Sequence, residues 1–416
     1  MHVMRWRSRR TGVTERKLLS RSDGGIRTGI GRWPAFWIVT VTLGLYFVAA
    51  AVPSPLYAVY AAKWHFSAIE VTEVFAVYVV ALLVALLLTG SLSDSVGRRP
   101  VILAALVVQS ASMAMFLSAS NVEWLFAARI TQGIATGVVT SALAASLVDL
   151  QPAEHPTLAP VVNSSTPILA LALGALTSAA LVQYAPDPLY LVFWLLLTAF
   201  VGAGVAIVLI PEPTTRRRAV HLVPQVGVEA HVRPGFVAAL PILVAGWAVG
   251  GFYLSLGPSL ALELAASRNR VVGGFAIFVL AGVGAAAIVA LRTWPSKLLM
   301  VVGGTALTAG LAFTVLAVAV TAPVFFFAST AVTGVGFGIA WLGVLRSLVP
   351  LASPTGRAAL LAAIFVVAYI SFAVPAVIAG YLVTRIGLHD AALWYGGAAS
   401  LMALAGLVGS VSVSRT

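Results

Sequence analysis

The chain has 416 residues, of which 60% are hydrophobic and only 9% are charged. Because a soluble domain has about 25% charged residues, this composition excludes a soluble protein and indicates one that lies largely in lipid. The formal charge is +12, but the arginines are scattered between apolar runs rather than gathered in a basic domain, so we expect no nucleic-acid partner.

The first 34 residues are expected to form a basic cytoplasmic tail. Residues 1–33 carry nine Lys or Arg but no short apolar core before a small-residue cleavage site, so this segment does not resemble a secretory signal. Two roles stay open for its charge. It fixes the topology of the protein, or it also contacts anionic lipid, where each basic residue contributes about 1 kcal/mol.

Twelve apolar runs follow the tail. A hydrocarbon core of about 30 Å needs a helix of about 20 mostly apolar residues, and the runs are too long for barrel strands. We therefore predict an all-α membrane protein with transmembrane helices at 35–60, 70–92, 100–119, 123–149, 157–184, 189–210, 236–262, 271–291, 297–319, 323–349, 356–384 and 390–412. We expect prolines inside the runs to kink these helices rather than end them: Pro53, Pro55, Pro167, Pro241, Pro258 and Pro375.

The basic residues predict which way the spans point. With the amino terminus inside, the tail and the loops on its side hold twenty Lys or Arg, whereas the opposite loops hold four and one, Arg129, lies inside a span. Loops rich in Lys and Arg stay on the cytoplasmic side of a membrane. We therefore expect a multi-pass protein of the cytoplasmic membrane with both termini in the cytoplasm.

The chain is expected to divide into two halves of six spans each. Residues 211–235 form the only long polar connection between spans, and they separate a predicted bundle at 35–210 from one at 236–412. A shift of about 200 residues aligns Gly133 and Gly137 with Gly334 and Gly338. Such repeats produce two pseudo-symmetric bundles with a binding site between them, near the middle of the bilayer.

Residues 90–101, GSLSDSVGRRPV, place charge and glycines between the second and third spans. The stretch resembles the loop signature G-x-L-x-D-R-x-G-R-R of the major facilitator superfamily, although Ser95 stands where the family usually has arginine. The resemblance implies a cytoplasmic latch that joins the two halves when the outer side is open. The matching residues with the charges and glycines of such a latch are Gly90, Asp94, Gly97, Arg98 and Arg99.

Asp149 is a predicted partner of this loop. It lies 20 residues beyond Arg129 in the fourth span, about 30 Å along a helix, so we expect it at the cytoplasmic level and able to pair with Arg98. The alternative is that these charges only fix the topology.

A second resemblance to the family lies in the fourth span, where RITQGIATG fits the pattern R-x-x-Q-G-x-x-x-G. Arg129, Gln132 and Thr136 share one helical face. We expect this face to look into the bundle as part of a substrate or proton pathway, because charge inside a span costs about 2.5–3.5 kcal/mol and usually serves function. The alternative is an arginine that snorkels to the nearby outer surface. The stretch VPSPLYAVY also resembles a bacterial, efflux-like branch of the family.

The remaining pathway candidates are one acid and six aromatic residues. Glu73 is the deepest carboxylate at the outer start of the second span, with a solvated helix end as the alternative reading. The resemblance places spans 1, 4, 7 and 10 around the cavity, although aromatic residues in spans also serve as packing and interface anchors. The aromatic candidates are Tyr46, Tyr57, Trp247, Tyr253, Trp341 and Tyr369.

Several chemistries find no support in the sequence. The chain has no cysteine, and its six histidines form no close metal-binding pair. Neither a G-x-x-x-x-G-K nor a G-x-S-x-G motif occurs. We therefore expect no metal, no cofactor and no enzymatic activity.

The sequence thus predicts a secondary active transporter that moves a small amphipathic molecule by alternating access. Proton-coupled efflux is the preferred version and a monomer the expected unit, since a mostly apolar cavity with one arginine suits an amphipathic molecule better than a sugar. The family's antiporter signature in the fifth span survives only as Pro167 and Gly174, which leaves antiport without support from that motif. An uptake carrier or proton symporter stays open, as does a transporter-like membrane sensor without transport.

Overall fold

The computed structural model describes residues 30–90, 92–152, 154–155, 157–210, 212, 226–353 and 355–413. Within these ranges the regular structure is helical, with no strand. Most of the predicted basic tail and most of the central polar loop lie outside the described residues.

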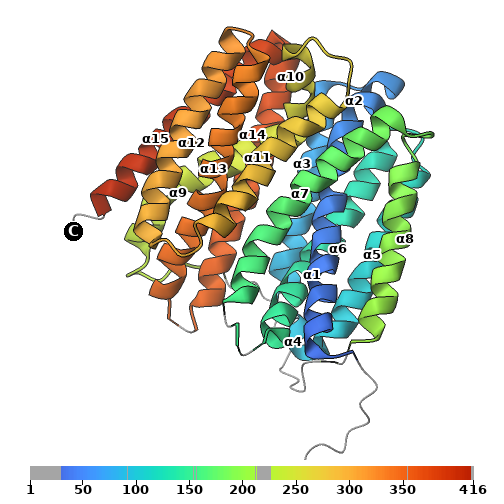
Figure 1. The fold of residues 1–416 in the computed structure, drawn as a ribbon, viewed down its shortest axis with the longest axis vertical. Coiled ribbons are helices and arrows are strands. Elements are labelled where there is room, and N and C mark those ends of the chain that lie inside the picture. Colours follow the sequence, from blue (N-terminus) through green and yellow to red (C-terminus); the bar gives the residue numbers. More distant parts are fainter. Residues whose placement is uncertain are drawn as a thin grey trace, which may run out of the picture.

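The first bundle contains six membrane-length spans. Its first span is built from two helices, α1 (Arg32–Ala51) and α2 (Pro53–Trp64), and the short helix α4 (Leu92–Val96) connects the next two spans. Figure 1 shows this bundle in blue to green. Its other spans are α3 (Ala68–Thr89), α5 (Arg98–Leu117), α6 (Val122–Leu150), α7 (Leu158–Tyr184) and α8 (Leu191–Val208).

The second bundle repeats this plan. A long helix, α9 (Arg233–Ser255), is followed by the short α10 (Gly257–Leu264), and a 3-10 turn, η1 (Val349–Leu351), precedes the last two spans. Twelve helices of the described chain are long and apolar enough to cross a membrane, which confirms the predicted fold class. The remaining spans are α11 (Val271–Ala290), α12 (Ser296–Ala319), α13 (Pro323–Leu348), α14 (Arg357–Ile386) and α15 (Leu388–Val413).

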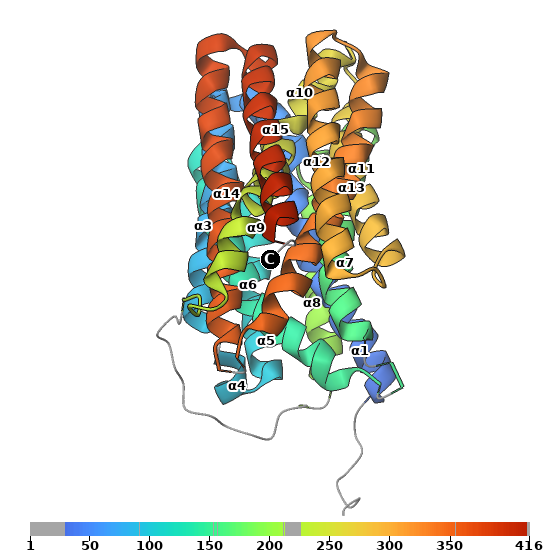
Figure 2. The same ribbon diagram turned by 90° about the vertical axis from the view of Figure 1, so that its left-hand side faces the viewer.

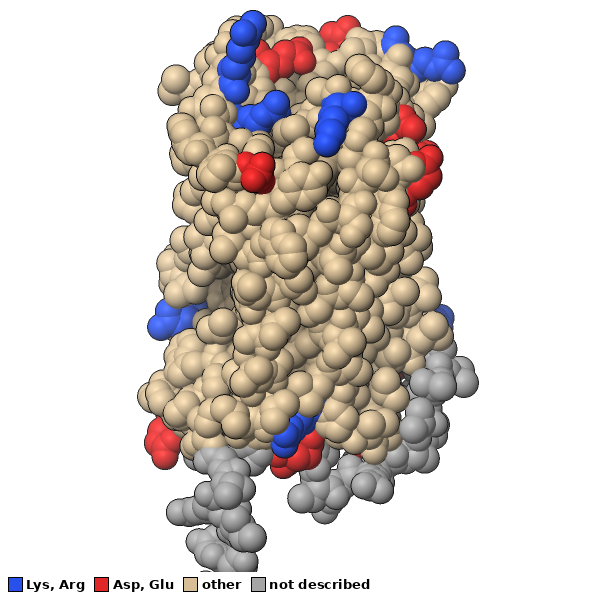
Figure 3. All heavy atoms as spheres, turned by 90° about the vertical axis from the view of Figure 1, so that its right-hand side faces the viewer, with Lys and Arg blue, Asp and Glu red and all other residues tan. Residues whose placement is uncertain are grey.

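Two helix pairs join the bundles. Helix α3 lies along α14, and α7 lies along α11, as the views in Figures 1 and 2 show. Figure 3 shows that Lys, Arg, Asp and Glu gather mainly near the two ends of the molecule, with a broad belt of other residues between them. This belt has the character of a surface that faces hydrocarbon.

The aligned glycine pairs perform the same task in both bundles. A Cβ on Gly133 or Gly137 of α6 would lie 2.4 Å from a backbone oxygen of α3. On α13, a Cβ on Gly334 or Gly338 would lie 2.4 or 2.2 Å from a backbone oxygen of α11. Small residues let membrane helices approach this closely, so the sequence repeat corresponds to a repeated helix crossing.

The prolines divide into two groups, which corrects one expectation. Pro167, Pro241 and Pro375 lie inside α7, α9 and α14. In contrast, Pro53 and Pro258 stand in the first turns of α2 and α10, so the preceding helix ends there. Proline lacks an N–H and fits the first turn of a helix without loss. Both bundles therefore have a broken first span.

Candidate functional site

A cavity of about 1370 Å³, including its open part, lies between the two bundles. Nine of its lining side chains are aromatic and none is charged. Four helices of the first bundle (α1, α3, α6 and α7) and four of the second (α9, α11, α13 and α14) contribute to the wall. A cavity of this size and character, shared by two bundles, suits a small and largely apolar molecule.

The two ends of the cavity differ. We call the end of the molecule that carries Asp94 the Asp94 end, and the opposite end, which carries Ser67, the Ser67 end. At the Ser67 end the bundles touch so closely that a Cβ on Gly380 would lie 2.1 Å from Thr72 Oγ1. A Cβ on Gly274 of α11 would likewise lie 2.4 Å from the Ala179 Cβ of α7, the second pair of helices that joins the bundles.

Part of the lining lies toward the Asp94 end of the molecule. Thr140 stands beyond the middle of α6, Asn163 in the first third of α7, and Leu345 in the last turn of α13, whereas Phe75 and Leu254 lie nearer the Ser67 ends of α3 and α9. The cavity is therefore closed at the Ser67 end and extends toward the Asp94 end.

Trp247 forms the centre of an aromatic wall. Its ring centroid lies 5.2 Å from that of Trp341 and 5.4 Å from those of Tyr369 and Phe372, each in an edge-to-face arrangement. Such pairs contribute about 0.5–1.5 kcal/mol beyond their buried area. Phe372 also meets Phe75 of the first bundle at 5.0 Å, so the wall continues across the interface between the bundles.

The break between α1 and α2 leaves the Ala49 carbonyl without its helical partner. Pro53 has no N–H to donate to the Ala49 carbonyl, four residues earlier. Three side chains from neighbouring helices donate to carbonyls at this break: Gln132 Nε2 to Ala49 O at 2.9 Å, Arg129 Nη1 to Ala50 O at 3.1 Å, and Ser178 Oγ to Val52 O at 2.7 Å. The broken span is therefore held by side chains of α6 and α7.

Arg129 is fully buried, so the alternative of an arginine that snorkels to the surface is wrong. Its Nη1 also lies 2.7 Å from Gln132 Oε1, and its guanidinium stands 4.1 Å from the centre of the Tyr78 ring. Tyr78 lines the cavity. The guanidinium thus lies behind the cavity wall, and its Nε and Nη2 have no hydrogen-bond partner among the described residues.

Three of the predicted pathway residues line the cavity, namely Trp247, Trp341 and Tyr369. Gln132 and Thr136 are fully buried beside Arg129, as expected for a helical face that looks into the bundle. Arg129, Gln132 and Thr136 do not line the cavity, and neither do four further predicted residues. They are Tyr46, which packs against Phe200, the buried Tyr57, the half-buried Glu73, and Tyr253.

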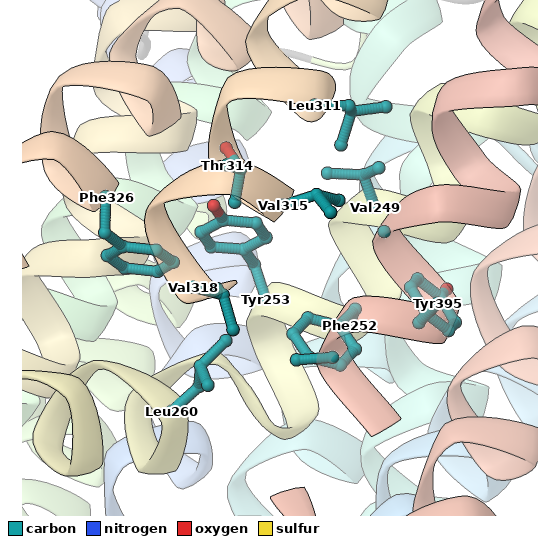
Figure 4. A pocket seen from close by; sticks show the side chains of 12 residues that line it. Val249, Phe252, Tyr253, Leu260, Leu311, Thr314, Val315, Val318, Phe326 and Tyr395 are labelled. Carbon is teal, nitrogen blue, oxygen red and sulfur yellow. The ribbon is translucent and has the colours of Figure 1, made fainter. Parts of the chain in front are cut away.

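Tyr253 occupies a different place from the one expected. It lines a smaller void inside the second bundle, where Figure 4 shows it near Phe326 and Val318. Its hydroxyl is 2.7 Å from Thr330 Oγ1, and its ring stacks on Phe326 at 6.1 Å. The side chain therefore serves the packing of this bundle.

Other cavity residues escaped sequence reasoning. Helices α3, α7, α11 and α14 supply much of the wall, beyond the four spans that the resemblance implied. Among the omitted residues are Phe75, Tyr78, Asn163, Ser164, Phe365 and Phe372. The triplet NSS at 163–165 was the one available polar signal.

The charged cluster at the Asp94 end is centred on Arg98. Its Nη1 contacts Asp94 Oδ1 at 2.5 Å and Ser93 Oγ at 2.7 Å, and its Nε contacts Asp149 Oδ2 at 3.3 Å. The expected pair of Arg98 with Asp149 is thus present. These partners all belong to the first bundle, in a structure whose Ser67 end is closed.

Glu212, which sequence reasoning missed, caps the start of α5. Its carboxylate oxygens each accept a backbone N–H, from Arg98 and from Arg99, at 2.9 Å. Gly97 has a φ of +111° and directs the chain into this helix, a conformation that favours glycine. Gly90 ends α3, where a Cβ would lie 3.1 Å from the Leu86 carbonyl oxygen.

We expect the substitution Asp149→Asn to have a small effect on stability. The side chains of Arg98 and Asp149 are 12% and 35% exposed, and partly exposed ion pairs contribute about 0–1 kcal/mol. Thermal unfolding in detergent should therefore show a decrease in midpoint of a few degrees at most. A large loss of stability would show that the pair supports the fold rather than a conformational change.

Glu229 is the corresponding anchor in the second bundle. Its carboxylate accepts the backbone N–H of Ser353 at 2.9 Å and the Ser353 hydroxyl at 2.7 Å. These hydrogen bonds hold the pKa of Glu229 below its usual value. Both carboxylates that border the central loop are thus bonded to the turns that precede helices.

The pKa of Glu229 predicts a pH-dependent contribution to stability. Because its pKa is lower in the folded state, the contribution is present above the unfolded pKa and is lost as the pH falls through the folded pKa. We expect Glu229→Gln to lower the melting temperature at neutral pH, with the difference shrinking as the pH falls below the ordinary pKa of glutamate and vanishing below the lowered pKa of the folded state. Glu263→Gln, at an exposed position, is the matched control. A deficit that does not depend on pH would contradict this account.

Comparison with known protein families assigns most of the chain to one family. The sequence model of the Major Facilitator Superfamily matches residues 39–369, well over half of the chain. No curated protein matches the chain significantly in sequence.

Solved structures of transporters share the fold at low identity. The human organic anion transporter MFSD10 (TETRAN) has 16% identity and a TM-score of 0.65, with 90% of this chain and 99% of that chain covered. The nucleoside transporter NupG has 12% identity and a TM-score of 0.69, with 89% and 98% covered. The xylose transporter XylE from E. coli has 14% identity and a TM-score of 0.70, with 90% and 96% covered.

The family match indicates membrane transport rather than enzymatic catalysis. Together with twelve spans in two six-helix bundles around a shared cavity, it shows that the chain belongs to the Major Facilitator Superfamily.

Proposed function

We propose that this protein is a secondary active transporter that exports a small amphipathic molecule by alternating access, coupled to protons. The observation that supports this most is the uncharged aromatic cavity between the bundles, closed at the Ser67 end and extended toward the Asp94 end. A site whose walls belong to two bundles changes its open end when the bundles rock against each other.

The proposal places the protein in the cytoplasmic membrane as a monomer, with both termini and the Asp94 end in the cytoplasm. The excess of Lys and Arg on that side supports this orientation. The cavity then faces the cytoplasm in the described structure. A cytoplasm-facing cavity is the state in which an exporter takes up its substrate.

The cluster at the Asp94 end is the proposed latch. Glu212 accepts the backbone N–H groups of Arg98 and Arg99 at the first turn of α5. The Arg98 side chain forms ion pairs with Asp94 and Asp149. When the Ser67 end opens, the Asp94 ends of the bundles approach, and this cluster becomes available to the second bundle. Gly90 and Gly97 allow the loop to make that approach.

Proton coupling needs a group that exchanges protons during the cycle. No acidic residue lines the cavity among the described residues. We assign the exchange to Glu73, which is half-buried on α3, the helix that also carries the cavity residues Phe75 and Tyr78. Arg129 and Gln132 belong to the proposed pathway through their hydrogen bonds to the broken first span, and Thr136 through its place beside them on α6.

Transport in proteoliposomes tests the proposal. We expect a pH gradient to drive flux of at least one member of a panel of neutral, anionic and cationic aromatic compounds, and a protonophore to abolish it. Export predicts that cells lacking the protein accumulate this compound. Lower accumulation in such cells would indicate uptake, and saturable binding without flux of any compound would indicate a sensor.

A further inference from the structure

The cavity wall carries no ionised side chain to pair with a charged substrate. None of its lining residues is Asp, Glu, Lys, Arg or His. An ion moved from water into such a site loses its hydration without gaining a counter-charge, so its binding is disfavoured. The wall therefore selects against cations and anions.

The nearest charge behind the wall adds to the selection against cations. Arg129 is fully buried behind Tyr78 and makes no ion pair with any described residue. Its positive charge repels an ammonium group in the cavity, yet the Tyr78 ring lies between the guanidinium and the cavity, so an anion finds no direct contact with it.

One side of the cavity presents hydrogen-bond acceptors. The hydroxyl of Thr140 donates its proton to Thr136 O at 2.6 Å, and that of Ser164 donates to Pro160 O at 2.8 Å. A hydroxyl whose only proton is used in this way still has lone pairs to accept a hydrogen bond. Both oxygens are thus acceptors toward a ligand.

Asn163 belongs to the same side. Its Nδ2 donates to Ala144 O at 3.3 Å, which orients the amide and leaves Oδ1 without a partner among the described residues. Ala144 lies one helical turn beyond Thr140, on the same face of α6, so this contact brings Asn163 close to Thr140. Together with Ser164, they form an acceptor group on the first bundle.

The opposite side is aromatic. Trp247, Trp341, Tyr369 and Phe372 present rings from the second bundle. Flat apolar molecules bury their faces well against such a surface. The cavity therefore has one face for an aromatic ring system and another for a hydrogen-bond donor.

From this arrangement we propose that the substrate class is a neutral aromatic molecule with an N–H or O–H donor, and that Asn163 is the residue that recognises this donor. The proposal rests on the proposed transport function and adds the chemistry of the cargo. A carboxylate finds no cation in the wall and meets three acceptor oxygens against a single remaining amide N–H at the Asn163 side, and an ammonium faces the Arg129 charge.

Equilibrium dialysis of the full chain in nanodiscs tests the class with four matched probes: indole, N-methylindole, tryptamine and indoleacetate. Empty nanodiscs correct for partition into lipid. We expect indole to bind about fivefold more tightly than N-methylindole, as expected for one neutral hydrogen bond. We also expect tryptamine and indoleacetate to bind more weakly than indole. Tighter binding of tryptamine, equal binding of indole and N-methylindole, or no saturable binding of indole would overturn the proposal.

Variants of Asn163 test the residue. Asn163→Leu should bring the affinities for indole and N-methylindole to within about twofold of each other. Asn163→Asp keeps an acceptor and adds negative charge, so it should keep the preference for indole over N-methylindole and gain affinity for tryptamine. Ser165→Ala, two residues away on α7 and outside the cavity wall, should leave the pattern of the wild type unchanged. A full preference for indole over N-methylindole in Asn163→Leu would exclude Asn163 as the acceptor.

This experiment separates the inference from the function on which it rests. If the predicted binding pattern appears but no probe is transported in proteoliposomes, the proposed transport is wrong while the binding chemistry stands. If flux appears but follows the cationic probe, the substrate class is wrong while transport stands.

Discussion

Replacing Gly274 by alanine is expected to open the Ser67 end of the protein. A Cβ at this position would lie 2.4 Å from Ala179 Cβ and 2.7 Å from Ala175 O, so α11 and α7 must separate to accommodate it. Overpacking of this kind costs about 1–3 kcal/mol, which shifts a two-state equilibrium by about tenfold. This overpacking free energy destabilises only the conformation in which α7 and α11 are in close contact at the Ser67 end.

The absence of cysteine from the chain provides a clean reporter. Thr72→Cys places a thiol on α3, where it faces α14, at a site that is fully buried in the described structure. In the Gly274→Ala background, a membrane-impermeant maleimide should label this thiol about tenfold faster. A second reporter, Leu345→Cys, lies in the cavity wall near the Asp94 end. In the Gly274→Ala background its thiol should be labelled more slowly than in the background with Gly274.

Gly282→Ala, on the same helix, is the matched control, because its Cβ would meet Ala172 Cβ at 3.7 Å, an ordinary contact. This variant should label like the wild type at both reporters. If Gly274→Ala raises labelling at both ends together, the substitution loosens the fold. It then does not shift the equilibrium between a conformation closed at the Ser67 end and one closed at the Asp94 end.

The spans and the helix crossings were predictable because the physics that produces them leaves marks in the sequence. Backbone groups in lipid require long apolar helices, and close helix crossings require small residues such as glycine. The glycine pair at 133 and 137 and its repeat at 334 and 338 therefore indicated two similar bundles. The loop at Asp94 and Arg98 was predictable for the same reason, since charge in so apolar a chain is rare and mostly lies near the end of a span.

The cavity wall was much less predictable. In a soluble protein an apolar face marks the core, but in a membrane both the lipid side and the interior are apolar. Tyr46 and Tyr369 therefore look alike in the sequence, although one packs between α1 and α8 and the other lines the cavity. Arg129 was recognised as important, but its burial depends on the break at Val52, which turns carbonyls toward α6.

The substitution Arg129→Met is expected to reduce proton-driven flux by about tenfold or more while leaving the protein folded. It removes the charged donor to Ala50 O in the broken first span, and a hydrogen bond to a charged group contributes about 1.5–3 kcal/mol. It also removes a buried guanidinium that has no counter-charge, which offsets part of this loss of stability. The midpoint of thermal unfolding should therefore change by only a few degrees, and flux in proteoliposomes should fall.

Two companion variants decide how Arg129 acts. Arg129→Lys keeps the charge but loses the planar fork that reaches both Ala50 O and Gln132 Oε1, so full flux in this variant would assign the effect to charge alone. Gln132→Met removes the donor to Ala49 O in the same break. If both side chains serve to hold that break, the double variant should lose little more flux than Arg129→Met alone, because residues that act on one element are not additive. Fully additive losses would instead give the two side chains separate roles in the pathway.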